Sequence, residues 1–296
     1  MKKKLILITG SSGFIGNLYL RHSLKKGYKI LDLLRKKHKK NKDLNFLRKK
    51  YKKNYKSIFY SNLSEINKKL KQKKVDYFIN FATLYKNDHK HNDIPSFIES
   101  NILFPSIVLD SINKGLKKII NFGTMMQHID GKNYLPKNFY ASTKSAFEMI
   151  LKFYSINNKK IKLYNLKFYE SFSENDKRKK LIPTLINNYK KKITTRIISN
   201  KLELNIIHTE DIIKAIDILL AKNLKTGNYC LKQTKNTKIN ELISKINKGQ
   251  KRCLNVKYLS NKVIKPKSNK LQILPYWKPR EKIDIKIIKK FIYETN

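Results

Sequence analysis

Tyr140 and Lys144 are the residues of this chain whose types and spacing point most directly to proton chemistry. Residues four positions apart on a helix lie on one face, so the phenol and the ammonium could share a small site. A free tyrosine has a pKa of about 10, and each unit of lowering requires about 1.36 kcal/mol of preferential stabilisation of the phenolate, which a nearby ammonium can supply. Because the chain holds 17 Tyr and 67 Lys and Arg, such pairs also arise by chance, and the pair alone identifies no site.

A hydroxyl group stands 16 residues before Tyr140, at Thr124. It follows the segment Lys118–Gly123, whose short apolar centre predicts a buried strand. The end of that strand would deliver the hydroxyl. An alcohol, a phenol and an amine in one site could move a proton to or from a substrate oxygen.

A glycine-rich segment near the start indicates a binding site for a diphosphate. It follows the apolar run 5–8, which predicts a buried strand, and precedes an amphipathic stretch that predicts a helix. Gly10 permits the tight turn, Gly13 lets the backbone approach a diphosphate, and Gly16 allows the helix to pack closely on the strand. The helix N-terminus would then point its free N–H groups at an anion. An ordinary glycine-rich turn is the alternative, but the strand and helix around this one argue against it.

With these segments in place, the chain resembles the extended short-chain dehydrogenases/reductases, the NAD-dependent epimerase/dehydratase family, in the branch that acts on nucleotide sugars. Thr9–Gly16 matches the family signature TGxxGFIG, Tyr140 and Lys144 match its YxxxK pair, and Thr124 falls where the family places its catalytic Ser or Thr. The resemblance spans nearly the whole chain, with further matching segments at Phe81–Thr83, Asn101, Leu166–Tyr169, Lys180–Pro183, His208–Asp211 and Trp277–Pro279.

The resemblance implies a hydride transfer between a nicotinamide and a carbon of a sugar ring. Tyr140 would move the matching proton, Thr124 would hydrogen-bond the same oxygen, and Lys144 would orient the nicotinamide ribose and lower the pKa of the phenol. The residues expected at the cofactor are Gly10, Ser12, Gly13, Phe14, Ile15, Gly16, Arg35, Asn62, Leu63, Phe81, Ala82, Thr83, Asn101, Tyr140 and Lys144. Those expected at the substrate are Met125, Gln127, His128, Glu170, Arg178 and Lys180. No metal site is expected.

The end of the second predicted strand, residues 28–34, favours one form of the cofactor. NAD-specific relatives usually place a carboxylate there to hold the ribose 2′-hydroxyl. This chain has Leu34 followed by Arg35, and a cation beside that position favours the phosphate of NADP. We therefore expect NADP(H), with NAD(H) as the alternative if Asp32 is the acidic residue and the register differs by two.

Length and element order predict an α/β fold, a Rossmann doubly wound parallel sheet with a smaller C-terminal α/β substrate lobe. Strands alternate with helices through residue 168, with mostly short connections apart from the basic segment 36–56. We expect residues 1–168 with 202–232 to form the NAD(P)-binding domain. Residues 169–201 with 233–296 would form the substrate lobe.

The formal net charge of +46 raises the question of a polyanionic partner. Only seven of the 67 basic residues are Arg, and the lysines are spread over most surface-like positions, which favours a compositional origin over a nucleic-acid site. No specific nucleic acid is therefore expected. Two cysteines, Cys230 and Cys253, favour a reducing cytosol, and the absence of a run of about 18 apolar residues predicts no membrane span.

Three reactions of the family compete. Dehydration needs an extra acid/base pair directly after Thr124, but Met125 and Met126 stand there and thioethers cannot move protons. Epimerisation needs the Thr, Tyr and Lys with tightly held NAD, and 4-ketoreduction needs the same residues with exchangeable NADPH. Arg35 and the resemblance of Gly123–His128 to reductases that make CDP-linked dideoxyhexoses favour reduction of a nucleotide-diphospho-4-keto-6-deoxyhexose, in the synthesis of surface polysaccharides such as lipopolysaccharide.

Departures from the family pattern leave the substrate site less defined. Leu204 stands where many relatives carry an Arg for the substrate diphosphate, and Lys167 replaces the strand Arg. Arg178 or Lys180, in the polar segment that follows, would then bind the diphosphate. A catalytically silent dinucleotide-binding module is a further alternative, although the chain retains its Tyr and Lys. A homodimer could form through residues 95–113 and 140–156.

Overall fold

The computed structural model describes residues 4–173, 176, 178, 180–267, 270–280, 288–289 and 292–293. Packing divides the chain into two compact units. The first comprises Met1–Lys167, Ile216–Cys230 and Lys270–Pro275, and the second comprises Phe168–Ala215, Leu231–Asn269 and Tyr276–Asn296. Relative to the expected ranges, residues 168, 202–215 and 231–232 lie in the second unit and residues 270–275 in the first. The cofactor and substrate roles expected for the two parts stay predictions.

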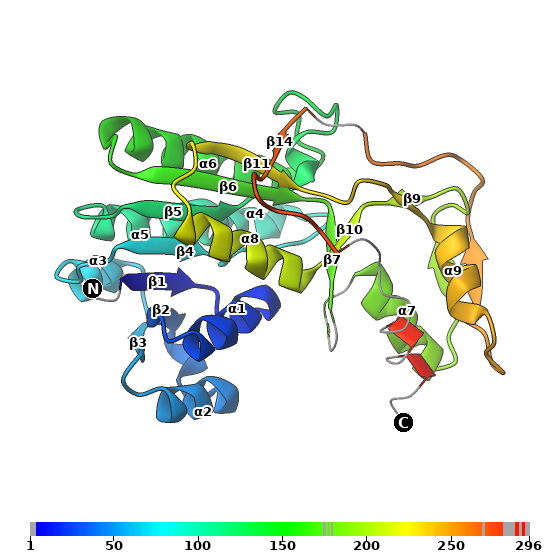
Figure 1. Ribbon diagram of the computed structural model, residues 1–296, viewed down its shortest axis with the longest axis horizontal. Helices are drawn as coiled ribbons and strands as arrows, with labels where there is room; N and C mark the ends of the chain where they lie inside the picture. Colours follow the sequence, from blue (N-terminus) through cyan, green and yellow to red (C-terminus); the bar gives the residue numbers. More distant parts are fainter. Residues whose placement is uncertain are drawn as a thin grey trace. The chain divides into compact units, whose positions relative to one another are not determined.

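An eight-stranded sheet forms the centre of the first unit, in the order β14-β11-β6-β5-β4-β1-β2-β3 (Figure 1). Its strands are β1 (Leu5–Thr9), β2 (Lys29–Arg35), β3 (Tyr55–Tyr60), β4 (Tyr77–Asn80), β5 (Lys118–Phe122), β6 (Lys162–Phe168), β11 (Gly227–Leu231) and β14 (Gln272–Ile273). The neighbouring pairs from β6 to β3 are parallel. Because β2 and β4 lie on opposite sides of β1, the strand order reverses there, and such sheets bind ligands outside the carboxyl ends of the strands at that point. The predicted doubly wound α/β fold is confirmed.

The helices of the first unit bury their apolar faces against the sheet. They are α1 (Phe14–Lys25), α2 (Lys42–Lys50), α3 (Ser64–Leu70), α4 (Ile94–Ile98), α5 (Phe104–Ile112) and α6 (Phe139–Asn157), with the short turns η1 (Lys36–Lys40), η2 (His91–Asp93), η3 (Glu99–Leu103) and η4 (Met125–Gln127). One apolar cluster joins α3, α5 and α6 to strand side chains such as Leu7, Phe78 and Ile119. Figure 1 shows α1 next to β1, and the His22 Nε2 on α1 lies 2.8 Å from the Asp217 Oδ2 of α8 (Thr209–Ala221).

The basic segment 36–56 contains η1 and α2 before it enters β3. Asn41 caps α2, since its side chain accepts a hydrogen bond from the Leu44 N–H at 3.0 Å. Leu44 and Leu47 on one face of α2 are buried, and the lysines of the segment stay exposed. The segment is therefore an anchored connection with a solvated basic face.

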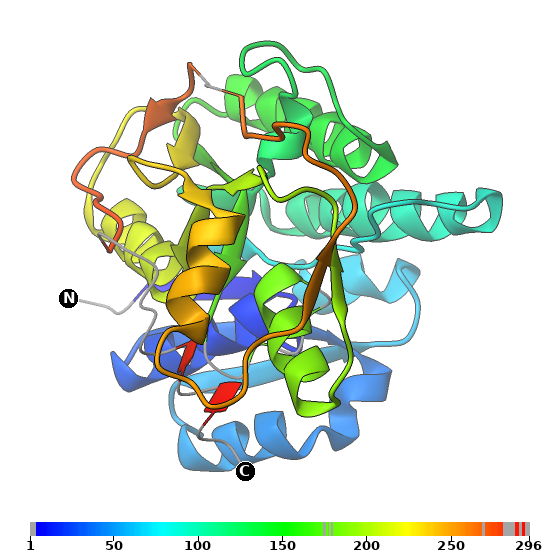
Figure 2. The ribbon, with the colours of Figure 1, turned by 90° about the vertical axis from the view of Figure 1, so that its right-hand side faces the viewer.

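The second unit has its own apolar core. It contains β7 (Glu170–Phe172), β8 (Thr195–Ile197), β9 (Glu203–Leu204), β10 (Ile206–His208), β12 (Thr237–Lys238), β13 (Val256–Tyr258), α7 (Leu181–Lys190), the first part of α8, and α9 (Ile239–Asn247). The strands form three pairs, β7 with β10, β8 with β13 and β9 with β12. The core joins Leu185 of α7 to Leu242 and Ile246 of α9; both helices are seen in Figure 2. None of the helices in the described ranges combines the length and apolar character needed to cross a bilayer.

Candidate functional site

The glycine turn between β1 and α1 is sterically closed to larger residues. Gly10 has φ +76°, and a Cβ atom there would lie 2.5 Å from the Ala82 nitrogen, two residues after β4. A Cβ atom on Gly16 would lie 2.3 Å from the Gly10 oxygen. At Gly10 and Gly16 the backbone of the turn thus packs too closely on its neighbours to leave room for a side chain.

A pocket of about 260 Å³ lies over this turn, at the carboxyl ends of the central strands. It is lined by Gly10, Ser12, Gly13, Leu33, Leu34, Arg35, Lys37, His38, Tyr60, Phe81, Ala82, Thr83, Leu84, Ser100 and Phe104. Seven residues expected at the cofactor are therefore brought together in it, namely Gly10, Ser12, Gly13, Arg35, Phe81, Ala82 and Thr83.

Other residues expected at the cofactor lie outside the lining of this pocket. Phe14 and Ile15 are half-buried at the start of α1, and Asn62 is exposed after β3. Leu63 packs against the apolar cluster of the sheet. Their expected contacts with a cofactor stay predictions.

The end of β2 carries basic rather than acidic side chains into the pocket. Arg35, Lys37 and His38 are lining residues, and no carboxylate is among the lining. Burial, followed by the charges of Lys37 and Arg35, lowers the pKa of His38. The Glu99 Oε1 lies 3.6 Å from the Arg35 Nη2, and the carboxylate offsets part of the guanidinium charge. This end of the pocket suits an anionic group.

Asp32 is buried inside β2 and does not line the pocket. Its Oδ2 accepts hydrogen bonds from the Ser11 hydroxyl and the Tyr55 hydroxyl, both at 2.6 Å. Burial raises the pKa of Asp32 to about 6, while these two hydrogen bonds and Arg48 act in the opposite direction. Asp32 therefore ties the glycine turn to β2 and β3, and is not placed to hold a ribose hydroxyl in the pocket.

The turn after β5 is bonded to the start of α6, so the hydroxyl and the phenol are carried by joined segments. Thr124 is buried, and its Oγ1 accepts a hydrogen bond from the Met126 N–H at 3.2 Å. The Lys137 N–H donates to the Met126 carbonyl at 2.8 Å. Asn138 caps α6, and Tyr140 is the second residue of the helix. The structure thus brings together the segments that hold Thr124 and Tyr140.

Lys144 lies one turn after Tyr140 and is 2% exposed. Burial lowers its pKa to about 8, and the nearby Glu148 carboxylate opposes that effect. At neutral pH the amine therefore stays mainly protonated. The Tyr140 ring meets the Tyr85 ring edge-on, with centroids 4.9 Å apart.

Asn101 fixes α6 against the loop after β4. Its Nδ2 donates to the Thr143 hydroxyl, next to Lys144, at 3.0 Å. Its Oδ1 accepts from the Leu84 N–H at 2.7 Å and from the Thr83 hydroxyl at 3.1 Å. Asn101 therefore positions both the pocket wall and the helix that carries the phenol and the amine.

Met125 and Gln127 are engaged inside the first unit. The Met125 sulfur lies 3.8 Å from the Cys230 sulfur, and Met125 is 4% exposed. Gln127 is fully buried, with its Oε1 accepting the Thr124 N–H at 2.8 Å and its Nε2 donating to Glu148 at 3.0 Å. These contacts shape the turn, and an additional contact with substrate stays a prediction.

His128 is also buried, with both ring nitrogens bonded. Nδ1 lies 2.8 Å from the Asn133 carbonyl, and Nε2 lies 2.7 Å from the Lys167 ammonium. Because an ammonium only donates, Nε2 must accept, so the ring is neutral with its proton on Nδ1. Burial, followed by the charge of Lys167, lowers the pKa of His128 and reinforces this state. A role of His128 at the substrate stays a prediction.

Sequence reasoning missed Glu148 and treated Lys167 only as a replaced arginine. The two form a buried ion pair, with Nζ and Oε2 2.9 Å apart and side chains 0% and 2% exposed. The available signals were a glutamate four residues after Lys144 on the same helix and a lysine that stands between Leu166 and Phe168 in a strand.

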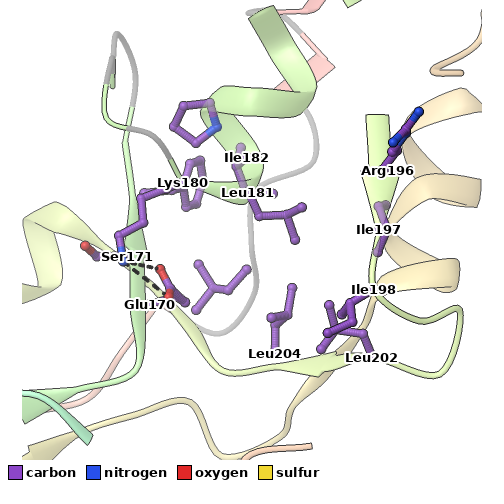
Figure 3. A pocket seen from close by; sticks show the side chains of 13 residues that line it. Glu170, Ser171, Lys180, Leu181, Ile182, Arg196, Ile197, Ile198, Leu202 and Leu204 are labelled. Atoms are coloured by element: carbon purple, nitrogen blue, oxygen red, sulfur yellow. Dashed lines mark hydrogen bonds and ion pairs between the residues drawn. The ribbon is translucent and has the colours of Figure 1, made fainter. Parts of the chain in front are cut away.

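Of the residues expected at the substrate in the second unit, Glu170 and Lys180 line a separate pocket of about 200 Å³ (Figure 3), and Arg178 is outside its lining. Its lining is mostly apolar, from Phe172, Leu181, Ile182, Pro183, Ile197, Ile198, Leu202, Leu204 and Ile206, with Glu170, Ser171, Lys180 and Arg196. Glu170 and Lys180 form an ion pair at 3.1 Å, drawn with dashed lines in Figure 3. Arg178 is held by Asp176 and by Ser171, to which it donates hydrogen bonds. Within the described ranges, no group of three His, Cys, Asp or Glu side chains could hold a metal ion.

The sequence is similar to those of known proteins. The family described as "NAD dependent epimerase/dehydratase family" matches residues 6–231. The CDP-abequose synthase of Yersinia pseudotuberculosis is 28% identical over 228 residues, which cover 76% of this chain and 75% of that protein. The CDP-abequose synthase of Salmonella muenchen is 22% identical over 228 residues, 76% of this chain and 73% of that protein.

Among the solved structures that share the fold are two epimerases. One is a UDP-N-acetylglucosamine 4-epimerase from Methanobrevibacter ruminantium M1 in complex with UDP-N-acetylmuramic acid, with a TM-score of 0.79, 22% identity, and coverage of 99% of this chain and 98% of that chain. The other is a UDP-glucuronic acid 4-epimerase from Bacillus cereus in complex with UDP-glucuronic acid and NAD, with a TM-score of 0.79, 17% identity, and coverage of 98% of each chain.

Proposed function

The chain belongs to the NAD dependent epimerase/dehydratase family, and from this premise we propose that it reduces a nucleotide-diphospho-4-keto-6-deoxyhexose with NADP(H). The observation that carries the proposal is the set of basic side chains at the end of β2. Arg35, Lys37 and His38 line the pocket above the glycine turn without a lining carboxylate. A 2′-phosphate would find cations there, and the 2′-hydroxyl of NAD would find no acidic acceptor. The similarity to the two CDP-abequose synthases supports a nucleotide-linked sugar as substrate.

The glycine turn supports the proposal that the pocket binds the diphosphate end of a dinucleotide. A Cβ atom at Gly10 would clash with the Ala82 nitrogen, so this position must be glycine and its backbone carries no side chain. The pocket extends from Gly13, at the start of α1, to Arg35. The helix N-terminus can therefore meet a diphosphate while the basic end meets the ribose phosphate.

The catalytic residues would act on the carbonyl group of the sugar. NADPH, when bound, supplies the hydride that reduces the carbonyl carbon. Tyr140 donates its phenolic proton to the carbonyl oxygen, and the Thr124 hydroxyl donates a hydrogen bond to the same oxygen. The Lys144 ammonium stabilises the phenolate that remains on Tyr140. Because Met125 and Met126 carry no acid or base, the chain has no pair for dehydration directly after Thr124.

The pocket of the second unit would receive part of the nucleotide. Its apolar wall, with side chains such as Ile182 and Leu204, suits a base or a ribose. The ammonium of Lys180, already paired with Glu170, would reach the diphosphate once the pair opens. Arg178 would add a second cation, at the cost of its contacts with Asp176.

A second candidate function is NAD-dependent epimerisation of a nucleotide sugar. It uses the same Thr124, Tyr140 and Lys144. The ion pair between Arg35 and Glu99 favours it, because the carboxylate offsets the charge that would attract a 2′-phosphate. An epimerase would interconvert two sugars without net consumption of NADPH.

The test is the oxidation of NADPH, followed at 340 nm, with a panel of nucleotide-linked 4-keto-6-deoxyhexoses. We expect turnover with at least one of them, and a rate about 100- to 10,000-fold lower in Tyr140→Phe, which lacks the proton donor. Tyr154→Phe is the matched control, because Tyr154 lies on the same helix with its hydroxyl on Asp110. Undiminished turnover in Tyr140→Phe, or none with the whole panel, would refute the proposal, and interconversion of sugars without NADPH oxidation would support the epimerase.

A further inference from the structure

Glu148 is the centre of a buried polar cluster behind the turn that carries Thr124. Its Oε2 lies 2.9 Å from the Lys167 ammonium and accepts the Tyr134 hydroxyl at 2.7 Å. Its Oε1 accepts from Gln127 Nε2 at 3.0 Å. Both oxygens therefore have partners, which is the condition under which a buried ion pair is tolerated.

The carboxylate determines how the Gln127 amide is oriented. A carboxylate only accepts hydrogen bonds, so the NH2 group of the amide must face Glu148. The Ser145 hydroxyl supports the same orientation of the amide. Because it donates its proton to the Ala141 carbonyl, its oxygen can accept a hydrogen bond from Gln127 Nε2, at 3.2 Å. The Oε1 atom is thereby left to accept the backbone N–H of Thr124 at 2.8 Å.

The cluster also packs directly on the backbone before Thr124. A Cβ atom at Gly123 would lie 2.6 Å from the Gln127 Oε1 and 2.7 Å from the Glu148 Oε1. It would lie 3.1 Å from the Lys167 Cγ. Gly123 thus allows the polar groups to reach the turn, and the turn and the cluster form one packed unit.

The same carboxylate acts on the amine of the proposed site. Glu148 follows Lys144 by one helical turn, and both are buried on α6. The Glu148 charge raises the pKa of Lys144 against the effect of burial. Glu148 is therefore connected to the backbone of Thr124 through the Gln127 amide, and to Lys144 by charge.

We propose that Glu148 is a positioning residue of the proton transfer, which holds the Thr124 hydroxyl in place by fixing the Gln127 amide. The inference rests on the proposed function. It assigns Gln127 to the same task, as the link between the carboxylate and the turn. The alternative is an ion pair with Lys167 that stabilises the fold without any connection to Thr124.

Glu148→Gln tests this with little change in volume. A second amide can present an NH2 group to Gln127, which would turn the Gln127 amide and break its bond to Thr124. We expect kcat for NADPH oxidation to fall at least tenfold, with less than a threefold change in the KM for NADPH. In a Thr124→Ala background, the same substitution should lower kcat less than threefold. Glu65→Gln, which breaks an exposed pair with Lys69, is the control and should leave kcat unchanged. An equal loss in both backgrounds would overturn the proposal.

Amide hydrogen exchange at Thr124, measured by NMR, tests the positioning without any turnover. We expect at least tenfold faster exchange at Thr124 in Glu148→Gln than in the parent, with exchange in β1 unchanged. Gln127→Met, which removes the link but keeps the ion pair, should reproduce the loss of kcat and the faster exchange, and it serves as the test if Glu148→Gln does not fold. Parent-like exchange at Thr124 in these variants would overturn the inference. Faster exchange in a protein that turns over no sugar would support the positioning and refute only the proposed function.

Discussion

Asp32→Asn should change how the stability of the protein depends on pH. Asp32 is fully buried in β2, with its Oδ2 accepting hydrogen bonds from Ser11 and Tyr55. Its Oδ1 is buried without a hydrogen-bond partner. Asparagine can keep its oxygen toward the two hydroxyls and place its NH2 group where Oδ1 now lies. The substitution therefore removes a buried charge while it preserves the contacts of the glycine turn.

The size of the effect follows from the pKa of Asp32. Burial raises this pKa from its usual 3.8 to about 6, so the folded state favours the protonated carboxyl group. The associated stability is fully present below pH 3.8 and is lost as the pH rises through about 6. The whole effect is about 3 kcal/mol, of which roughly 2 kcal/mol is lost between pH 4 and pH 8. The neutral asparagine has no such loss.

Urea unfolding of the parent and Asp32→Asn, followed by circular dichroism at pH 4, 5, 6, 7 and 8, measures this difference. The free energy of unfolding of Asp32→Asn, relative to the parent, should rise by about 2 kcal/mol from pH 4 to pH 8. The steepest change should fall between pH 4 and pH 6. A difference between the two proteins that is the same at every pH would refute the reasoning, because it would mean that Asp32 titrates alike in the folded and unfolded chains.

Two further predictions concern ligand binding. Arg35→Ala should weaken NADPH binding about tenfold or more, because one charge-assisted hydrogen bond is lost, and should leave NADH binding within threefold. Fluorescence titration of both coenzymes measures the two dissociation constants. An unchanged ratio of these constants would refute the proposed preference for NADP(H). Lys180→Ala should weaken binding of the nucleotide sugar about tenfold with the affinity for NADPH unchanged. Calorimetry checks this, and parent-like binding of the sugar would show that the diphosphate lies elsewhere.

The glycine turn could be predicted from the sequence because its physics is local. The φ of Gly10 and the close approach of Gly16 to it depend on a few neighbouring residues. The apolar run before the turn predicts the strand, and the amphipathic stretch after it predicts the helix. The parallel sheet could be predicted because strands alternate with helices along the sequence through residue 168. The end of β2 was also predictable, since Leu33 and Leu34 reach the pocket and Arg35 follows them.

The contacts of Asp32 and Gln127 could not be predicted in the same way. The partners of Asp32 come from a turn 21 residues earlier and a strand 23 residues later. The partners of Gln127 include Glu148, 21 residues away on a different element. Residue type and spacing do not reveal such contacts, because strand register and helix rotation decide them. The sequence therefore predicted a substrate contact for Gln127, which stays a prediction, but did not predict its partners within the protein.

Because the chain is rich in lysine, its sequence does not reveal which lysines are buried. Among 67 Lys and Arg, a lysine attracts no attention in the sequence, yet Lys144 and Lys167 are the fully buried cations of the described residues. Desolvation of an ammonium costs several kcal/mol unless a partner offsets it, and Glu148 is the carboxylate that acts on both. A basic surface can arise from codon bias at little energetic cost. The burial of two ammonium groups around one carboxylate, in contrast, has a high energetic cost. The cost of burying these two lysines is therefore a physical reason for our proposal that the junction of β5, β6 and α6 is functional.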